Sequence, residues 1–261
     1  MRGIAVIGNL ARDTIDGGPS RVGGAPYHAA RALRLLGGSS RIVARCAETD
    51  RRALAGPLAA LGVRFDWLPA PSTTAFELRY TGEEREMTVT DTGAPWTLAE
   101  ARSVGRADWV QVGALTRADF PSDVLAALAR DRRLALDGQA LVRPARTGPL
   151  VLDADFDPSV LRHVTALKLS EQEVGILGGE ERVASLGVPE LLLTHGSTGC
   201  VVVVRGARET VPVRRVLTSN PTGAGDAFLA GYGWARAAGH RPVSAARHAA
   251  TTTARVLELA S

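Results

Sequence analysis

The chain has 261 residues, of which 45% are hydrophobic and 22% charged, a composition typical of a soluble globular protein. Its net charge of +4 comes from arginines spread along the sequence, with Lys168 as the only lysine and no basic block interleaved with aromatic residues, so nucleic-acid binding is disfavoured. Cys46 and Cys200 stand far apart, the N-terminus resembles no signal peptide, and no apolar run is long enough to span a membrane, so we expect a cytoplasmic protein without a disulfide framework.

The first part of the chain alternates between strand-like and helix-like patterns. Apolar strands are expected at 3–8 and 41–46, and helices at 27–36 and 51–61, which indicates parallel strands with helical crossovers. The turn signal Asp16-Gly17-Gly18-Pro19 predicts a small hairpin within 14–22. After Pro69 the rhythm breaks, because 73–80 and 85–90 alternate in the β manner around Thr81-Gly82-Glu83 and predict an inserted hairpin.

The alternation resumes in the second part of the chain. Strands are expected at 109–112, 134–137, 166–169 and 191–194, a hairpin at 200–205 and 210–216, and helices at 122–130, from 170, after Asp226 and at 244–258. No internal repeat, low-complexity tract or linker divides the sequence. The pattern therefore predicts one α/β unit.

The stretch 219–233 has the strongest chemical signal. An apolar run through Val216 stops at a turn that contains Gly223 and Gly225, which permit tight turning and close approach to a ligand. The amides of Ala224, Gly225 and Asp226 would then lie at the positive end of a helix, a favourable place for phosphate. A carboxylate beside that place suggests phosphoryl transfer, although aspartate is also a common helix cap with no catalytic role.

With this order of elements, the chain resembles the ribokinase-like (PfkB) family of carbohydrate and nucleoside kinases. The resemblance lies in four segments that follow one another in the family's order: Gly23-Gly24-Ala25-Pro26, Lys168-Leu169-Ser170-Glu171-Gln172-Glu173, Thr194-His195-Gly196-Ser197-Thr198-Gly199 and Pro221-Thr222-Gly223-Ala224-Gly225-Asp226-Ala227-Phe228. It implies a three-layer α/β/α ribokinase-like domain over 1–261, with a small β lid made of 13–22 and 73–90. It also implies ATP and Mg²⁺.

The same resemblance assigns roles to individual residues. Asp226 would be the base, with the backbone of Gly223, Ala224, Gly225 and Asp226 as an anion hole. The acceptor would be contacted by Asp13, Gly23, Gly24 and His28, and the nucleotide by Lys168, Ser170, Thr194, Gly196, Ser197, Gly199, Ala250 and Thr251. Glu173 would organise water around Mg²⁺. The competing interpretation is capping and packing for His28, an ordinary solvated side chain for Glu173, and plain helix packing for Ala250 and Thr251.

The acceptor is expected to be a small sugar, a cyclitol or a nucleoside. Gly113 and Ala114 stand where ribokinases have an acidic contact, which argues against ribose, and only Arg12 and Arg21 lie near the acceptor motifs, which disfavours a phosphorylated substrate. Asn220, in place of an aspartate, argues against potassium activation. Two alternative functions stay open, namely a catalytically silent sugar- or nucleotide-binding protein and an ATPase without an acceptor. The oligomeric state also stays open, and one form that it could take is a homodimer formed through the lid.

Overall fold

One large, mostly parallel sheet forms the centre of the molecule. The computed structural model describes residues 3–81, 84–217 and 221–259, and within them nine strands have the order β14-β13-β12-β11-β9-β8-β1-β4-β5. The strands from β12 to β5 in this order are parallel, and β13 and β14 form an antiparallel edge. Their bounds are β1 Ile4–Asn9, β4 Ser40–Ala47, β5 Phe65–Ala70, β8 Trp109–Gly113, β9 Arg133–Asp137, β11 Val164–Ser170, β12 Glu190–Thr194, β13 Cys200–Val204 and β14 Ala207–Val211.

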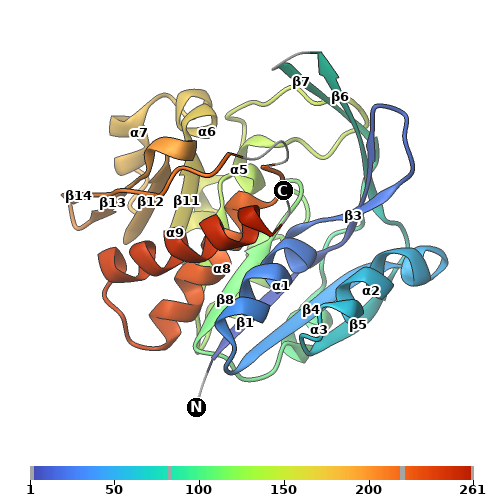
Figure 1. Ribbon diagram of the computed structural model, residues 1–261, viewed down its shortest axis with the longest axis horizontal. Coiled ribbons are helices and arrows are strands. Elements are labelled where there is room, and N and C mark those ends of the chain that lie inside the picture. Colours follow the sequence, from blue (N-terminus) through green and yellow to red (C-terminus); the bar gives the residue numbers. More distant parts are fainter. Residues whose placement is uncertain (1–2, 82–83, 218–220, 260–261) are drawn as a thin grey trace.

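Helices cover both faces of this sheet (Figure 1). One apolar layer joins the sheet to α1 (Ala25–Leu36), α2 (Arg51–Ala60), α8 (Ala224–Ala237) and α9 (Pro242–Glu258). The other joins it to α3 (Leu98–Ser103), α4 (Ser122–Ala129), α5 (Gln139–Val142), α6 (Glu171–Ile176) and α7 (Glu180–Ala184). The expected three-layer α/β/α fold is confirmed. In the described part of the chain, no helix combines the length and apolarity that a membrane span requires.

A second, smaller sheet stands beside the carboxyl ends of the central strands. Its five strands have the order β10-β7-β6-β2-β3, with bounds β2 Ala11–Ile15, β3 Arg21–Gly23, β6 Thr74–Thr81, β7 Glu84–Asp91 and β10 Gly148–Pro149. It unites the segments 13–22 and 73–90, because β2 lies parallel to β6 with Asp13 opposite Phe76; residues 82–83 of the second segment lie outside the described residues. Its buried face is apolar, with Phe76, Leu78 and Val89 against Leu115.

Two strands differ from the sequence-based expectations. A strand was expected at 210–216, but β14 starts earlier, because Arg205 and Gly206 adopt φ angles of 51° and 80° and form a tight turn directly after β13. Pro212 then ends the ladder, since it has no backbone N–H to donate. The edge strand β5 was not predicted at all; its side chains are mostly half-buried and it contains Pro69.

Candidate active site

The glycine turn at the start of α8 has the backbone geometry that the sequence suggests. Gly223 caps the helix with a φ of 80°, a conformation that favours glycine, and a Cβ atom there would lie 2.1 Å from His28 Nδ1. The amide of Ala224 donates to the carbonyl of Pro221 at 3.1 Å, so it is not one of the available anion-hole donors. The amides of Gly225 and Asp226 occupy the first turn, where the helix itself supplies no acceptor. Asn220 lies outside the described residues.

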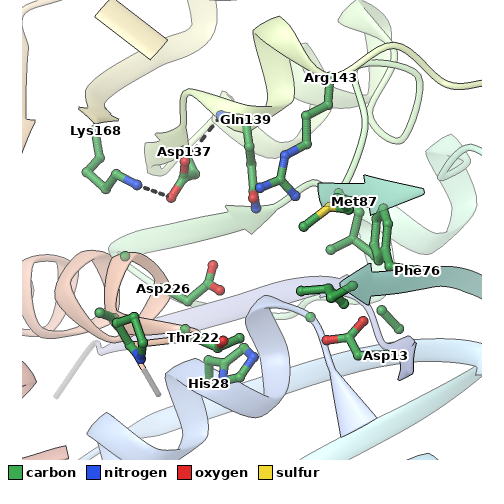
Figure 2. Close-up of a pocket in the computed structure, with 18 of the residues that line it drawn as sticks. Asp13, His28, Phe76, Met87, Asp137, Gln139, Arg143, Lys168, Thr222 and Asp226 are labelled. Carbon is green, nitrogen blue, oxygen red and sulfur yellow. Dashed lines mark hydrogen bonds and ion pairs between the residues drawn. The ribbon is translucent and has the colours of Figure 1, made fainter. Parts of the chain in front are cut away.

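A cavity of about 210 Å³ opens between this turn and the smaller sheet, and Figure 2 shows the side chains that point into it. Three titratable residues of its lining have a buried polar atom without a hydrogen-bond partner among the described residues, namely Asp13 Oδ1, His28 Nδ1 and Asp226 Oδ1. Folded proteins seldom leave such atoms unsatisfied. Hydroxyl groups of a polar ligand would satisfy all three.

The electrostatic environment of this cavity shifts the protonation of the same residues. Burial, and then the neighbouring carboxylate of Asp137, raise the pKa of Asp226 to about 7, against the lowering effect of Lys168. Burial also raises the pKa of Asp13 to about 6 and lowers the pKa of His28 to about 4. Near neutral pH, His28 is therefore an uncharged imidazole, and Asp226 is poised to accept a proton.

A larger cavity of about 550 Å³ lies on the other side of the turn, between α9 and the loop after β12. Seven of the predicted nucleotide contacts line it: Lys168, Ser170, Thr194, Gly196, Ser197, Gly199 and Ala250. The wall also includes the apolar side chains of Val213, Val216, Phe228 and Leu257. A polar inner end and an apolar wall of this size suit a ligand with a charged and an apolar part.

The two cavities meet at the start of α8. Lys168, Pro221, Ala224 and Gly225 line both of them, whereas Asp226 lines only the smaller one. The Lys168 ammonium lies 2.7 Å from Asp137 Oδ2, and a Cβ atom on Gly225 would come within 2.8 Å of Lys168 Nζ. A cation and two helix amides therefore converge where a group would pass from one cavity to the other.

Two predicted contacts do not line either cavity. Thr251 is exposed and donates its hydroxyl to the Arg247 carbonyl at 3.0 Å, because Ala250, Thr253 and Leu257 occupy the helix face that lines the cavity. Gly23 lies behind Asp13 instead, where a Cβ atom would be 2.0 Å from Asp13 Oδ2, so it lets the carboxylate fit rather than touching the cavity. Gly24 does line the smaller cavity.

Glu173 lies at the edge of the smaller cavity and also caps α6. Its Oε2 accepts from the Ser170 amide at 2.7 Å, and Ser170 Oγ accepts from the Glu173 amide at 3.3 Å. Burial raises the pKa of the Glu173 carboxyl, with a further contribution from Asp137. Within the described residues, no group of three or more His, Cys, Asp or Glu side chains is arranged to hold a metal ion.

Sequence reasoning missed several side chains of the smaller cavity. Asp137, Gln139 and Arg143 enter it from the end of β9, from α5 and from the residue after α5, and Phe76 and Met87 enter it from the smaller sheet (Figure 2). Leu78 of β6 and Leu115, which follows β8, also line it. The available signal was the acidic end of the strand at 134–137, because ligands of open α/β sheets bind at the carboxyl ends of parallel strands. The apolar residues gave no such signal.

Comparisons with known proteins identify a family and relatives of similar fold. Residues 17–259 match the pfkB family carbohydrate kinase profile. A fructokinase from Klebsiella pneumoniae is 26% identical over 253 residues, which cover 87% of this chain and 82% of the relative. A pyrophosphate-dependent kinase of the ribokinase family, solved with a pyrophosphate analog and myo-inositol, superposes with a TM-score of 0.85 and 25% identity over 98% of this chain and 95% of its own. A fructokinase from Vibrio cholerae O395, solved with fructose, ADP and calcium ion, gives a TM-score of 0.75 and 19% identity over 98% and 93%.

Proposed function

The chain belongs to the pfkB family of carbohydrate kinases, and on that premise we propose that it transfers the γ-phosphoryl group of ATP to a hydroxyl of a small sugar or cyclitol. The observation that supports this proposal best is the meeting of two cavities at the start of α8, with Asp226 on the side of the smaller one only. The larger cavity would hold the donor and the smaller one the acceptor. The transferred group would pass beside Lys168 and Gly225.

In this arrangement Asp226 is the general base. The acceptor hydroxyl gives its proton to the Asp226 carboxylate as its oxygen forms a bond to phosphorus, and the bond from phosphorus to the leaving oxygen of ADP breaks with its electron pair. The amides of Gly225 and Asp226, together with the Lys168 ammonium, hold the charge on the group in transit. Because phosphoryl transfer proceeds through a loose transition state, positioning and charge neutralisation do most of the catalytic work.

The larger cavity suits a nucleotide. Its inner end has the Lys168 ammonium and the Thr194 hydroxyl, and its outer wall has Phe228, Ala254 and Leu257, against which a purine would pack. Mg²⁺ neutralises phosphate charge when bound, and it would be held mainly by the phosphates and water. Glu173 is the carboxylate that would contact a water of its shell.

Pyrophosphate is a second candidate donor. It is favoured by the similarity to the pyrophosphate-dependent kinase, which superposes better than the ADP-bound fructokinase, with TM-scores of 0.85 and 0.75. Pyrophosphate would need only the inner end of the larger cavity, near Lys168. The outer end, beside Ala254, is required only by a donor that has a base.

The smaller cavity favours a ring-shaped polyol as acceptor. Its floor offers the unpartnered atoms of Asp13, His28 and Asp226 to hydroxyl groups, whereas Phe76 and Met87 on the lid side would cover the carbon–hydrogen face of a ring. A catalytically silent binding protein would have no need of a base with a pKa of about 7 at the junction of the cavities.

The test is a matrix of donors and acceptors. ATP and pyrophosphate, each with Mg²⁺, are combined with fructose, myo-inositol, ribose and nucleosides, and phosphorylated products are identified by ³¹P NMR and mass spectrometry. We expect product with a sugar or cyclitol. Absence of product with every acceptor would refute the proposal, and ATP consumption without any acceptor would identify a hydrolase.

A variant distinguishes the two donors. Ala254 is buried and lines the larger cavity from α9, so Ala254→Phe is designed to fill the space for a base and to leave the end beside Lys168 open. If ATP is the donor, the variant loses activity with ATP. If pyrophosphate is the donor, activity with pyrophosphate stays at the level of the unmodified protein, and Thr251→Ala, on the exposed side of the same helix, serves as a control.

A further inference from the structure

We propose that Asp137 is a positioning residue, which holds the Lys168 ammonium at the junction of the two cavities and thereby fixes the cation beside the phosphoryl group. This role rests on the proposed function, in which that junction is the place of transfer. Asp137 itself lies on the wall of the smaller cavity. It acts on the reaction through Lys168 and through Asp226.

The sheet places the two partners directly opposite each other. Asp137 is the last residue of β9, and Lys168 is its register partner on the neighbouring parallel strand β11. Asp137 Oδ2 accepts from Lys168 Nζ at 2.7 Å, and Asp137 Oδ1 accepts from the Gln139 amide at 3.2 Å. The carboxylate is therefore held at both oxygens, one by the backbone of α5 and the other by the cation (Figure 2).

The ion pair is buried but not closed off from ligands. The Lys168 and Asp137 side chains are only 7% and 6% exposed, yet both line the smaller cavity and Lys168 also lines the larger one. Within the described residues, Asp137 is the one hydrogen-bond acceptor in contact with the ammonium. An ammonium has three N–H donors, so phosphate oxygens can take the other two.

Without Asp137, the cation would have other carboxylates to turn to. Burial works against the charge on Lys168, but Asp137 and Glu173 raise the pKa of the ammonium above its ordinary value, with Asp226 as a further contributor. If the ammonium moved to Asp226, it would neutralise the charge of the base and would no longer contact the phosphoryl donor. Asp137 prevents this by keeping the cation on the β9 side of the junction.

Asp137 also acts on the base directly. The charged groups that face Asp226 are Asp137 from β9, Lys168 from β11, Glu173 from α6 and Arg143 from the segment after α5. After burial, Asp137 contributes most to the raised pKa of Asp226. Replacing Asp137 by a neutral residue therefore lowers the pKa of Asp226 and moves the acidic limb of the pH–rate profile to lower pH.

The single lysine gives this proposal a readout that is independent of activity. Lys168 is the only lysine. When a protein whose tag contains no lysine is labelled with ¹⁵N-lysine, it therefore has one side-chain ammonium signal. We expect a slowly exchanging signal in the unmodified protein that shifts on addition of ATP or pyrophosphate. In Asp137→Asn that signal broadens or disappears, because the fixed acceptor is lost.

The expected functional effects follow from the same contact. Asp137→Asn weakens donor binding about tenfold to hundredfold, the range for a charge-assisted hydrogen bond, and moves the acidic limb by about one pH unit. In the Lys168→Gln background, the same substitution changes donor affinity much less, because the partner it holds is gone. The double variant also restores charge balance, so it keeps the measurement possible if Asp137→Asn alone folds poorly.

Glu190→Gln is the matched control. Glu190 and Arg236 form a second buried ion pair at 2.5 Å, remote from both cavities, so this variant loses stability while its ammonium signal, donor affinity and pH profile stay unchanged. Unaltered donor affinity and an intact ammonium signal in Asp137→Asn would overturn the proposal, as would additive effects in the double variant. Absence of product from the unmodified protein would instead refute the proposed function, since the ammonium signal and donor binding are measured without turnover.

Discussion

Replacing Asp226 with asparagine is expected to lower turnover strongly and to stabilise the fold at the same time. Asp226 Oδ1 has no hydrogen-bond partner within the described residues, and the pKa of the carboxyl is about 7 instead of 3.8. An acid whose pKa is raised in the folded state destabilises that state when it is ionised. The cost is therefore absent below pH 3.8, grows as the pH rises, and is complete above about pH 7.

The magnitude follows from the two pKa values. Each unit of difference between the folded and the unfolded pKa corresponds to about 1.4 kcal/mol, so the upper bound on the stabilisation by Asp226→Asn is about 4 kcal/mol. Water in the cavity screens the half-buried carboxylate, and we expect about 2 kcal/mol. The loss of the base lowers kcat by about 10²–10⁴-fold. Asparagine has nearly the same shape, so packing in the cavity changes little.

The assay is urea unfolding at about pH 5 and about pH 8, with Asp119→Asn as the control. Burial raises the pKa of Asp119 as well, but both of its carboxylate oxygens accept hydrogen bonds that an asparagine would lose in part, from Asn9 at 3.2 Å, the Leu115 amide at 2.8 Å and Thr116 at 2.6 Å. The control therefore loses about 1–3 kcal/mol, the opposite sign. If Asp226→Asn were no more stable than the unmodified protein at the higher pH, the reasoning about burial would be wrong, and substantial turnover would remove Asp226 from the mechanism.

Three further results are expected. The kcat/KM of the unmodified protein rises with pH and levels off above about 7, since the Asp226 carboxylate must be ionised to accept a proton; a rate that is constant from pH 5 to 8 would contradict this. Gly223→Ala weakens acceptor binding, measured by calorimetry, because its Cβ atom would lie 2.1 Å from His28 Nδ1. Gly206→Ala has the same φ of 80° with no atom within 4 Å, so it loses about 1–2 kcal/mol of stability but keeps acceptor affinity. Thr251→Ala leaves the donor KM unchanged, and an increase would place that side chain in the donor site after all.

Local chemistry explains why the start of α8 could be predicted. A proline, a glycine with a positive φ and an alanine-rich run specify a turn and a helix start within a few residues. The helix begins at Ala224, slightly before the start expected after Asp226. A second local departure is the amide of Ala224, which donates to the Pro221 carbonyl, a bond that depends on the particular turn rather than on the presence of glycine.

The residues that sequence reasoning missed depend on tertiary structure. Asp137 and Lys168 are far apart in the sequence, and only the strand order β11-β9-β8 makes them neighbours. Arg143 enters the cavity from the segment after α5. A strand that ends in an acidic residue is a usable signal for such positions, but its partner can be named only once the order of strands is known.

The remaining differences from the sequence-based expectations concern the surface that a side chain faces. Thr251 is adjacent in sequence to Ala250, which lines the larger cavity, but the turn of the helix points it toward solvent. Val213 and Val216 are apolar as a strand would be, yet Pro212 excludes them from the sheet and they become part of the cavity wall. The apolar character of Val213 and Val216 agrees with their half-buried positions, but the sequence alone does not indicate that they face a cavity instead of a sheet.

The shared wall of the two cavities has a practical consequence for inhibitor design. Because Lys168, Pro221, Ala224 and Gly225 border both spaces, one molecule can occupy the two halves of the site through a short linker. A polyol tethered to adenosine by a phosphate chain would gain from the high effective concentration of its second half. Its tight binding would also hold the smaller sheet over the central one, which would favour crystals of the assembled site.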